Sequence, residues 1–280
     1  MKISGFTIVK NARKFNYPVL ESIRSVLPAC DEFIVNVGDS DDDTLSLIQS
    51  LPDPKIRIIR SQWKMDQKPD VLSYQTNLAL KECAGDWAFY LQSDEVIHED
   101  DLPRLLRLMT DLLKDSSVDG LRLRWLHFYG SYCRYRIDQG WFQKQCRIIR
   151  NNGGIESCKD AWTFERKDKR PMKVINSGSL LYHYGWVQPG EVMGQRRQNA
   201  RLLWNQELTD RDRAAVYEYG DLNRFPIYYG SHPEVMNELV AAHVLSGDDW
   251  NEIRQRFWWH PFLYLRPRRK TWRRVKEKIY

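Results

Sequence analysis

The sequence has no long apolar run, since no stretch approaches the roughly 18 consecutive apolar residues that a membrane-spanning helix needs. It also lacks a secretory signal at its start. Met1 leads directly into a short apolar segment and then into Lys10 and Arg13, with no small-residue cleavage site behind them. We therefore expect a cytosolic protein that does not span a membrane.

Cysteine is scarce, and its arrangement excludes two classes of site. The five cysteines are odd in number and widely spaced, and no two of them form a Cys-x-x-Cys pair. This pattern argues against a disulfide framework and against a zinc knuckle. Most of them are expected to be small core residues: Cys30, Cys83, Cys133, Cys146 and Cys158.

Excess positive charge is also missing from most of the chain. Residues 266–280 hold eight basic residues and one acidic residue, a net charge of +7, whereas the whole chain carries +6. Residues 1–265 therefore sum to −1, and the high isoelectric point is a property of the tail. This distribution argues against a nucleic-acid-binding surface on the body of the protein and indicates a basic C-terminal appendage.

Apolar strands alternate with amphipathic helices over the first 113 residues. This alternation predicts an α/β fold with a mostly parallel central sheet and helices on both of its faces. A further helix-rich pattern occupies residues 189 to about 219, and residues 155–164 have no regular pattern. The expected strands are 3–9, 31–38, 56–59, 87–91, 118–128, 145–150 and 174–182, and the expected helices are 17–27, 44–48, 71–83 and 102–113.

Three of the expected strands end in polar loops, at residues 10–13, 39–44 and 92–95. Because the carboxyl ends of parallel strands meet at one edge of a sheet, where open α/β sheets bind ligands, these loops are expected to gather there. Asp94 and Glu95 would supply oxygen ligands of the kind that Mg²⁺ or Mn²⁺ binds together with phosphate. The alternatives are that each loop is simply solvated and that the acidic pair caps the next helix.

The order of these features resembles glycosyltransferase family 2, whose members are nucleotide-sugar-dependent enzymes of the GT-A fold. An acidic loop rich in Ser and Thr follows the second strand at residues 39–44, and Thr76-Asn77 precedes the strand that leads into Gln92-Ser93-Asp94. The resemblance covers roughly residues 1–185. It implies a GT-A domain at residues 1–188, followed by a helical C-terminal extension at residues 189–280.

The chain departs from the family pattern at two places. Gln92 replaces the first Asp of the family's metal motif, and Val37 stands near the usual base- or phosphate-contacting Asp. The resemblance then implies a divalent metal, Mn²⁺ or Mg²⁺, held by Asp94 and His183, although metal independence is left open by Gln92. A packed core histidine is the alternative for His183. The implied nucleotide-sugar contacts are Asn11, Asp39, Asn77, Gln92, Ser93 and Asp94.

An inverting transferase also needs a base that takes the proton from the acceptor hydroxyl. In the family, this carboxylate lies between the metal motif and the late histidine. Asp160 is the first candidate and Glu156 the second, with Trp162 and Phe164 available to stack on a sugar. The alternative for this segment is a surface loop with an ordinary ion pair.

The resemblance implies transfer of a sugar from a UDP-, GDP- or dTDP-sugar to a glycan or lipid-linked acceptor, as in lipopolysaccharide or exopolysaccharide synthesis. The aromatic and basic residues 257–280 suit an anionic membrane surface, such as the inner face of the cell membrane. A solvated terminal helix and a nucleic-acid contact are the other interpretations of this tail. Two other functions stay open: a nucleotidyltransferase and a catalytically inactive glycan- or nucleotide-sugar-binding module.

Overall fold

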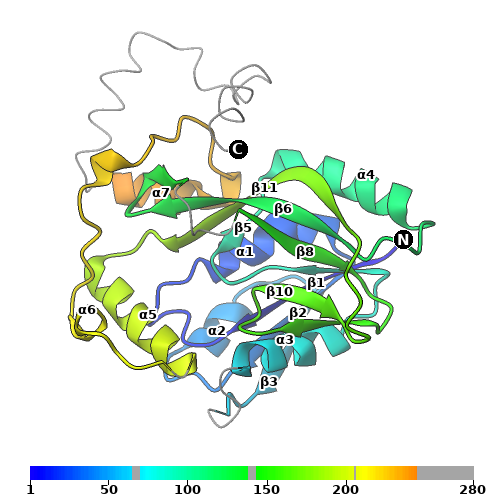
Figure 1. Ribbon diagram of the computed structural model, residues 1–280, viewed down its shortest axis with the longest axis horizontal. Helices are drawn as coiled ribbons and strands as arrows, with labels where there is room; N and C mark the ends of the chain where they lie inside the picture. Colours follow the sequence, from blue (N-terminus) through cyan, green and yellow to red (C-terminus); the bar gives the residue numbers. More distant parts are fainter. Residues whose placement is uncertain (65–69, 138–142, 205, 245–280) are drawn as a thin grey trace.

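The computed structural model describes residues 1–64, 70–137, 143–204 and 206–244. Within these residues the chain folds into one nine-stranded sheet, a separate two-stranded hairpin and flanking helices (Figure 1). Over the same ranges, no helix combines the length and the apolar character needed to cross a membrane. The predicted membrane-binding tail at residues 257–280 lies outside the described residues.

The first half of the sheet is parallel, with β1 at its centre between β2 and β4, and β3 beyond β2. β1, β2 and β4 are buried on both faces, which explains their largely apolar sequences, whereas β3 at the edge is only partly buried. The predicted strands and helices are confirmed here to within about two residues at each end. The elements are β1 (Ile3–Val9), α1 (Val19–Val26), η1 (Leu27–Ala29), β2 (Glu32–Gly38), α2 (Thr44–Gln49), β3 (Ile56–Ser61), α3 (Val71–Lys81) and β4 (Trp87–Tyr90).

The second half of the sheet mixes directions. It continues from β4 in the order β8, β6, β11 and β5, with β8 antiparallel to both β4 and β6, and with β11 parallel to β6. The predicted parallel arrangement therefore holds for the first four strands and for one later pair. The elements are β5 (Glu95–Val96), η3 (Glu99–Asp101), α4 (Leu102–Leu112), β6 (Gly120–Tyr129), β7 (Ser131–Arg136), β8 (Lys144–Arg150) and β11 (Val174–Trp186).

The segment predicted to be irregular, residues 155–164, is instead most of an antiparallel hairpin, so that prediction is wrong. The hairpin consists of β9 (Ile155–Cys158) and β10 (Thr163–Arg166), joined by a turn that carries Asp160. Ile155 and Phe164 are buried against α3 and the sheet, and every second residue faces outward. Strands of four residues are too short for this alternation to stand out in the sequence.

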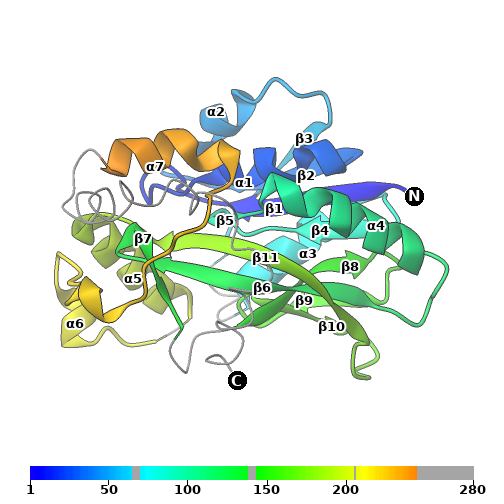
Figure 2. The same cartoon turned by 90° about the horizontal axis from the view of Figure 1, so that it is seen from above.

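Helices and hairpin cover the two faces of the sheet (Figure 2). The larger core cluster joins α1, α2 and α4 to one face, with Ile23, Ile48 and Met109 fully buried. The smaller cluster joins α3 and the hairpin to the other face. Four of the cysteines are buried, as predicted, and the fifth, Cys158, is half-buried.

The C-terminal segment begins with α5 (Gly190–Leu203), which lies beside the carboxyl ends of β1 and β4 (Figure 1). The helical pattern predicted up to about residue 219 is only partly found, because α5 is followed by the one-turn helix α6 (Asp210–Arg213) and then by non-helical chain. The described part ends with η4 (Leu222–Arg224), η5 (Glu234–Met236) and α7 (Asn237–Val244).

Candidate active site

A cavity of about 390 Å³ opens at the carboxyl ends of the parallel strands. Most of its wall comes from the loop after β1, the loop after β4, the turn of the β9–β10 hairpin, and α5, with single residues added from the chain after β2 and β3 and from α3. This is the edge at which the polar loops were predicted to gather. The lining residues include Lys10, Asn11, Lys14, Phe15, Tyr17, Asp41, Trp63, Gln92, Ser93, Asp94, Asp160, Arg196 and Trp204.

The loops after β1 and β2 are joined through Asn11. Its backbone has a φ of 55°, in the left-handed region that Asn tolerates better than most residues. Its side chain donates to Asp41 Oδ2 at 3.2 Å and accepts from the Asp41 N–H at 2.8 Å, while its own N–H donates to Ser40 Oγ at 3.0 Å. These contacts confirm that the loops at residues 10–13 and 39–44 lie together.

Asp39 is held at the surface of this region and is not among the lining residues. Lys10 Nζ lies 2.7 Å from Asp39 Oδ1, and the Trp63 N–H donates to the same oxygen at 3.1 Å. Partial burial opposes ionisation, but the hydrogen bonds from Lys10 and from Trp63 outweigh it and hold the pKa of Asp39 below its usual range. Because Lys10 lines the cavity, Asp39 influences the cavity indirectly, by holding the Lys10 side chain in place.

The loop after β4 carries Gln92, Ser93 and Asp94 to the cavity wall. Ser93 Oγ donates to the Ile8 carbonyl at 2.9 Å, which fixes this loop to the end of β1. The Gln92 side-chain amide lies 3.4 Å from the Ala161 carbonyl and so reaches the turn of the hairpin. The predicted strand end therefore lies between the β1 loop and the Asp160 turn.

Asp94 and His183 meet at this wall, as the resemblance implied. Asp94 Oδ1 lies 3.8 Å from His183 Nε2, and the two side chains are only 15% and 11% exposed. Gly185 makes the approach possible, because a Cβ there would stand 2.6 Å from Asp94 Oδ2 and 2.7 Å from the His183 ring. Asp94 lines the cavity, whereas His183 is not among the lining residues.

Burial determines the protonation of this pair. It raises the pKa of Asp94, although Arg196 opposes the shift, and it lowers the pKa of His183 to about 4. The imidazole is therefore neutral at pH 7. Its Nδ1 lies 3.0 Å from Nδ1 of His127 on the neighbouring strand β6, so one of the two rings donates to the other. A proton on Nδ1 of His183 leaves Nε2, the atom facing Asp94, with a free lone pair.

A carboxylate and an imidazole are both suitable ligands for Mn²⁺. A histidine that binds a metal ion is usually neutral, with its second ring nitrogen held by a hydrogen bond. Within the described ranges, no group of three or more His, Cys, Asp or Glu side chains could hold a metal ion. The pair therefore fits an ion whose remaining ligands come from outside the protein, such as the oxygens of a phosphate or water.

Asp160, the first candidate for the base, lies at the cavity in a strained turn. Lys159 and Ala161 on either side of it have φ angles of 57° and 61°, in the left-handed region. Its Oδ1 is buried and has no hydrogen-bond partner among the described residues. Burial raises the pKa of Asp160, with backbone hydrogen bonds opposing the shift. An unpartnered carboxylate oxygen that faces a cavity is able to accept a proton there.

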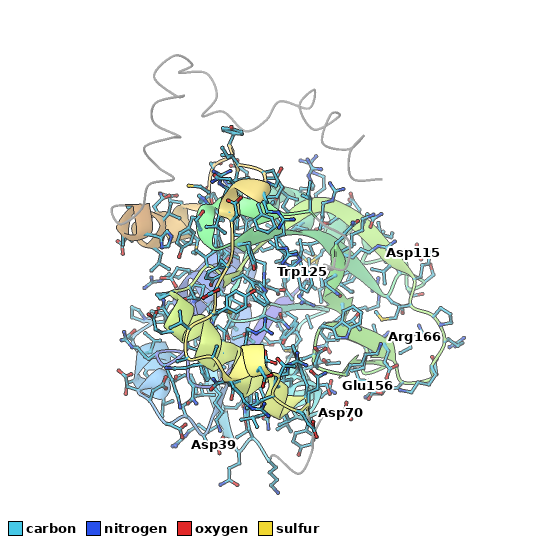
Figure 3. The ribbon with its side chains drawn as sticks, turned by 60° about the vertical axis from the view of Figure 1, so that its left-hand side comes forward. Asp39, Asp70, Asp115, Trp125, Glu156 and Arg166 are labelled. Atoms are coloured by element: carbon cyan, nitrogen blue, oxygen red, sulfur yellow. The ribbon has the colours of Figure 1, made fainter. Side chains whose placement is uncertain are left out.

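Glu156 and Asn77 lie away from the cavity lining. Glu156 sits on β9 opposite Glu165, and Lys169 Nζ is 3.4 Å from Glu156 Oε1. Figure 3 shows Glu156 near Arg166 and well apart from Asp39. Asn77 donates to the Ser157 carbonyl at 2.9 Å and accepts from the Ser157 N–H at 2.7 Å, so it fixes the hairpin to α3.

Glu95 was expected beside Asp94 as an oxygen ligand for a metal ion, but this expectation is wrong, because its side chain points into the interior and forms a buried ion pair with Arg147. Both side chains are fully buried, with Arg147 Nε 2.8 Å from Glu95 Oε2 and a second hydrogen bond at 2.9 Å. Glu95 also accepts from the Gln92 N–H, and Arg147 donates to the Trp162 carbonyl. The pair thus joins the Asp94 loop to the Asp160 turn. A basic residue inside an apolar strand was the signal that could have indicated it.

Arg196 of α5 lines the cavity and was also missed by sequence reasoning. It is 7% exposed, its Nε donates to the Phe15 carbonyl at 2.8 Å, and one terminal nitrogen donates to the Gly185 carbonyl. The guanidinium lies 4.0 Å from the centre of the Tyr17 ring. Arg196 and Arg197 are adjacent in a polar helix, so the sequence does not indicate which of them is buried.

Comparisons with known proteins identify the family of the chain. The family model described as glycosyl transferase family 2 matches residues 6–164, more than half of the chain. Among solved structures, the chain is similar to S. aureus TarS residues 1–349, with 17% identity over 75% of this chain and 67% of that one and a TM-score of 0.42. A structure of the same TarS fragment in complex with UDP-GlcNAc gives 16% identity over 75% and 68%, with a TM-score of 0.42.

A crystal structure described as that of a mycobacterial protein is similar at 14% identity over 74% of this chain and 75% of that one, with a TM-score of 0.40. No curated protein matches the sequence. The family match and the mixed sheet with its flanking helices confirm the predicted α/β, GT-A class of fold. On the residues matched, the chain belongs to glycosyl transferase family 2.

Proposed function

We propose that this glycosyltransferase moves a sugar from a nucleoside-diphosphate sugar to a hydroxyl group of a glycan or lipid-linked acceptor, with inversion at the sugar carbon, in cell-surface polysaccharide synthesis. The observation that carries the proposal is the unpartnered, buried Oδ1 of Asp160 in the same cavity as Asp94. One carboxylate is then available to the acceptor and the other to the donor.

In the proposed reaction Asp160 takes the proton of the acceptor hydroxyl. The hydroxyl oxygen forms the new bond to the anomeric carbon as the bond from that carbon to the phosphate oxygen breaks. The raised pKa of Asp160, caused by burial, makes its carboxylate a stronger base. The nucleoside diphosphate leaves with the negative charge.

Asn11, Gln92 and Ser93 are the proposed donor contacts, because they line the cavity beside Asp94. Asp39 contributes by fixing Lys10, and Asn77 contributes by fixing the hairpin that carries Asp160. Glu156 is the weaker candidate for the base, since it lies away from the cavity and pairs with Lys169.

Asp94 and His183 are the residues that would hold a divalent cation. Such an ion, when bound, supplies positive charge to the diphosphate as the glycosidic bond breaks. The chain's own contribution is to keep the imidazole neutral by burial and to keep both side chains close together across Gly185. This second contribution depends on glycine at position 185.

A thermal-shift screen with UDP, GDP and dTDP, each with and without Mn²⁺, tests the proposal on the purified protein. A specific nucleoside diphosphate is expected to raise the melting temperature, since a ligand at 100 times its Kd stabilises by about 2.7 kcal/mol. Hydrolysis or transfer of the corresponding nucleotide sugar should follow. Binding without any turnover would favour an inactive binding module, and no shift with any nucleotide would contradict the proposal.

A further inference from the structure

Arg196 is the cavity-lining cation that has no carboxylate partner among the described residues. The two lysines that line the cavity are paired: Lys10 lies 2.7 Å from Asp39, and Lys14 lies 3.6 Å from Asp41. Within the described part of the chain no ion pair involves Arg196, although it is far more buried than either lysine. A buried charge without a counter-ion is costly, and such charges are normally paired or ligand-bound.

The guanidinium has hydrogen-bonding capacity left over. Arginine has five N–H donors, and the two backbone carbonyls of Phe15 and Gly185 use donors on Nε and on one terminal nitrogen. The other terminal nitrogen, Nη2, is buried and has no partner within the described chain. These bonds fix the group between the β1 loop and the end of β11, with one nitrogen still available.

The field of Arg196 reaches the residues that handle the donor. It opposes the rise in the pKa of Asp94, and it contributes to the lowered pKa of His183. Arg196 therefore lies close to the cavity wall at which the donor's charge is expected. The residue lies outside the family match, which ends at residue 164, so family membership does not assign it a role.

We infer that Arg196 is a binding residue for the donor's diphosphate, donating from Nη2 to a phosphate oxygen and supplying positive charge to the leaving group independently of a metal ion. This inference rests on the proposed function. A guanidinium held by two carbonyls loses little freedom on binding, which suits it to stabilise charge that develops during bond cleavage. It also offers a reason for the replacement of an acidic metal-motif residue by Gln92.

Arg197 provides a matched control on the same helix. Its guanidinium is paired with Asp212 at 2.5 Å, and it does not line the cavity. R196Q, R196K and R197Q are to be compared with the wild type by calorimetry in EDTA. The ligands are UDP, GDP and dTDP, each measured beside its own nucleoside. The readout is the ratio of nucleoside Kd to nucleoside-diphosphate Kd, which isolates the diphosphate and is not moved by a general loss of folded protein.

In R196Q this ratio should fall by about 10-fold or more, with the nucleoside Kd unchanged, since a charged hydrogen bond to an anion is lost. The ratio should fall less in R196K, and in R197Q it should equal that of the wild type. An unchanged ratio in R196Q would overturn the role of Arg196 while leaving the proposed function intact. If R196Q does not fold, R196K decides: a ratio equal to that of the wild type rejects the inference. Failure of the wild type to bind any of the three nucleotides both in EDTA and with Mn²⁺ would overturn both proposals, whereas binding only with Mn²⁺ would overturn the metal-independent role of Arg196 alone.

Discussion

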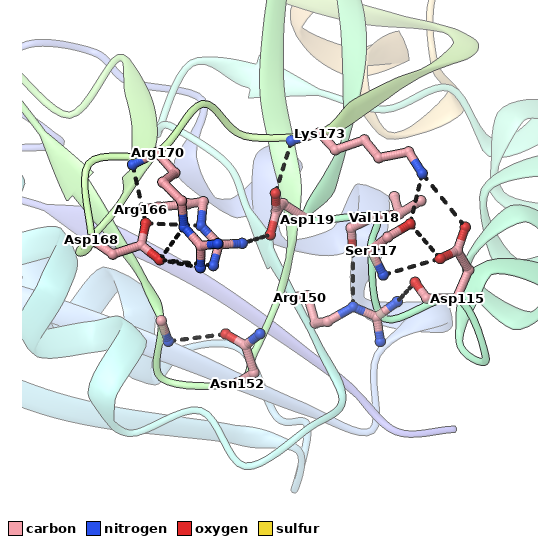
Figure 4. A network of polar contacts seen from close by, with 11 residues as sticks. Asp115, Ser117, Val118, Asp119, Arg150, Asn152, Arg166, Asp168, Arg170 and Lys173 are labelled. Carbon is pink, nitrogen blue, oxygen red and sulfur yellow. Dashed lines mark hydrogen bonds and ion pairs between the residues drawn. The ribbon is translucent and has the colours of Figure 1, made fainter.

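Two polar regions of the molecule are built in opposite ways. One lies at the base of the hairpin, where Asp119 accepts from Arg166 at 2.7 Å and from the Lys173 N–H at 2.8 Å (Figure 4). Asp168 in turn accepts from Arg166 and Arg170, which hold its pKa below the usual range. Each of these carboxylates has a cationic partner, and the network fastens β10 to the sheet.

The other region is the cavity. There Asp160 Oδ1, Arg196 Nη2 and Trp63 Nε1 are all buried without a hydrogen-bond partner within the described residues. Folded proteins rarely leave such atoms unsatisfied, and each costs free energy unless something outside the fold completes it. Other buried atoms without a partner among the described residues, such as Gln145 Nε2 and Ser179 Oγ, belong to residues outside the cavity lining, so it is the position of these three residues at the cavity that makes them available to a ligand. Substitutions should affect stability in the first region and activity in the second.

The largest expected effect is that of Asp160→Asn, which should lower kcat about 1,000-fold, within the range for loss of a general base. The variant keeps the shape of the side chain and removes its ability to take a proton. Transfer of sugar under saturating donor is the measurement. Activity within a few-fold of the wild type would show that Asp160 is not the base.

The same variant should be more stable than the wild type at pH 7. The folded-state pKa of Asp160 is raised by burial, so its stabilising contribution is present below its unfolded pKa and is lost as the pH rises through the folded value. The ionised form therefore costs stability at pH 7, and Asn removes that cost. Melting temperatures from pH 7 down to pH 3 should show the gain shrinking as the pH falls through the raised folded pKa, and no gain below about pH 4, the ordinary pKa of Asp.

Next in size is Asp94→Asn, which should reduce transfer about 300-fold, the effect expected when one group that stabilises charge is lost. Its melting temperature should not fall, since burial already disfavours the ionised carboxylate. Transfer assays and thermal unfolding on one preparation test both statements. A large drop in melting temperature together with full specific activity would show that Asp94 stabilises the fold, as Asp119 and Asp168 do, and has no role in transfer.

Arg147→Met tests whether the effect of a substitution on stability is determined by the residue's distance from the cavity or by its ion pair. Arg147 joins two segments of the cavity wall but is fully paired with Glu95. Removing one partner of a buried pair leaves an uncompensated charge, so we expect a loss of about 3 kcal/mol in the free energy of unfolding. Urea unfolding measures it. Unchanged stability would mean that Glu95 finds another partner or takes up a proton.

The smallest effect belongs to Asp119→Asn, for which we expect a loss of about 2 kcal/mol, because a buried, charge-assisted hydrogen bond to Arg166 is weakened. The activity of the folded fraction should stay within about two-fold of the wild type, since the residue lies outside the cavity. Urea unfolding and an activity assay corrected for the folded fraction provide the test. A selective loss of kcat would remove the distinction between the two regions.

The parallel half of the fold was predictable because its signals are local. Strands such as Ile3–Val9 are buried on both faces and therefore read as continuous apolar runs. The hairpin at residues 155–166 was missed because strands of four residues carry too few alternations to be recognised, and because its pairing depends on contacts with α3. The helix α5 was expected, but its 14-residue length and its contact with the cavity were not.

The site residues at the converging strand ends could be predicted from the sequence. A site residue on an element far away in the sequence could not. Asn11, Gln92, Ser93, Asp94 and Asp160 all line the cavity because parallel strands and the hairpin turn place them at one edge. Arg196 arrives from a helix whose register fixes which of two adjacent arginines is buried. That register depends on packing against Tyr17 and Phe15, which no local pattern in the sequence encodes.

The bond from Arg196 to the Phe15 carbonyl joins residues 181 positions apart in the chain, and the hydrogen bond from Asn16 to Gln188 joins residues 172 apart. Closing such long loops is entropically costly and comes late relative to local contacts. During synthesis the β1–β4 half emerges first, and about 200 residues must leave the ribosome before α5 can close the cavity. The parallel half can thus begin to fold while the cavity is still open on one side, and a nascent chain that stops short of α5 would present Asp94 without the cation of Arg196.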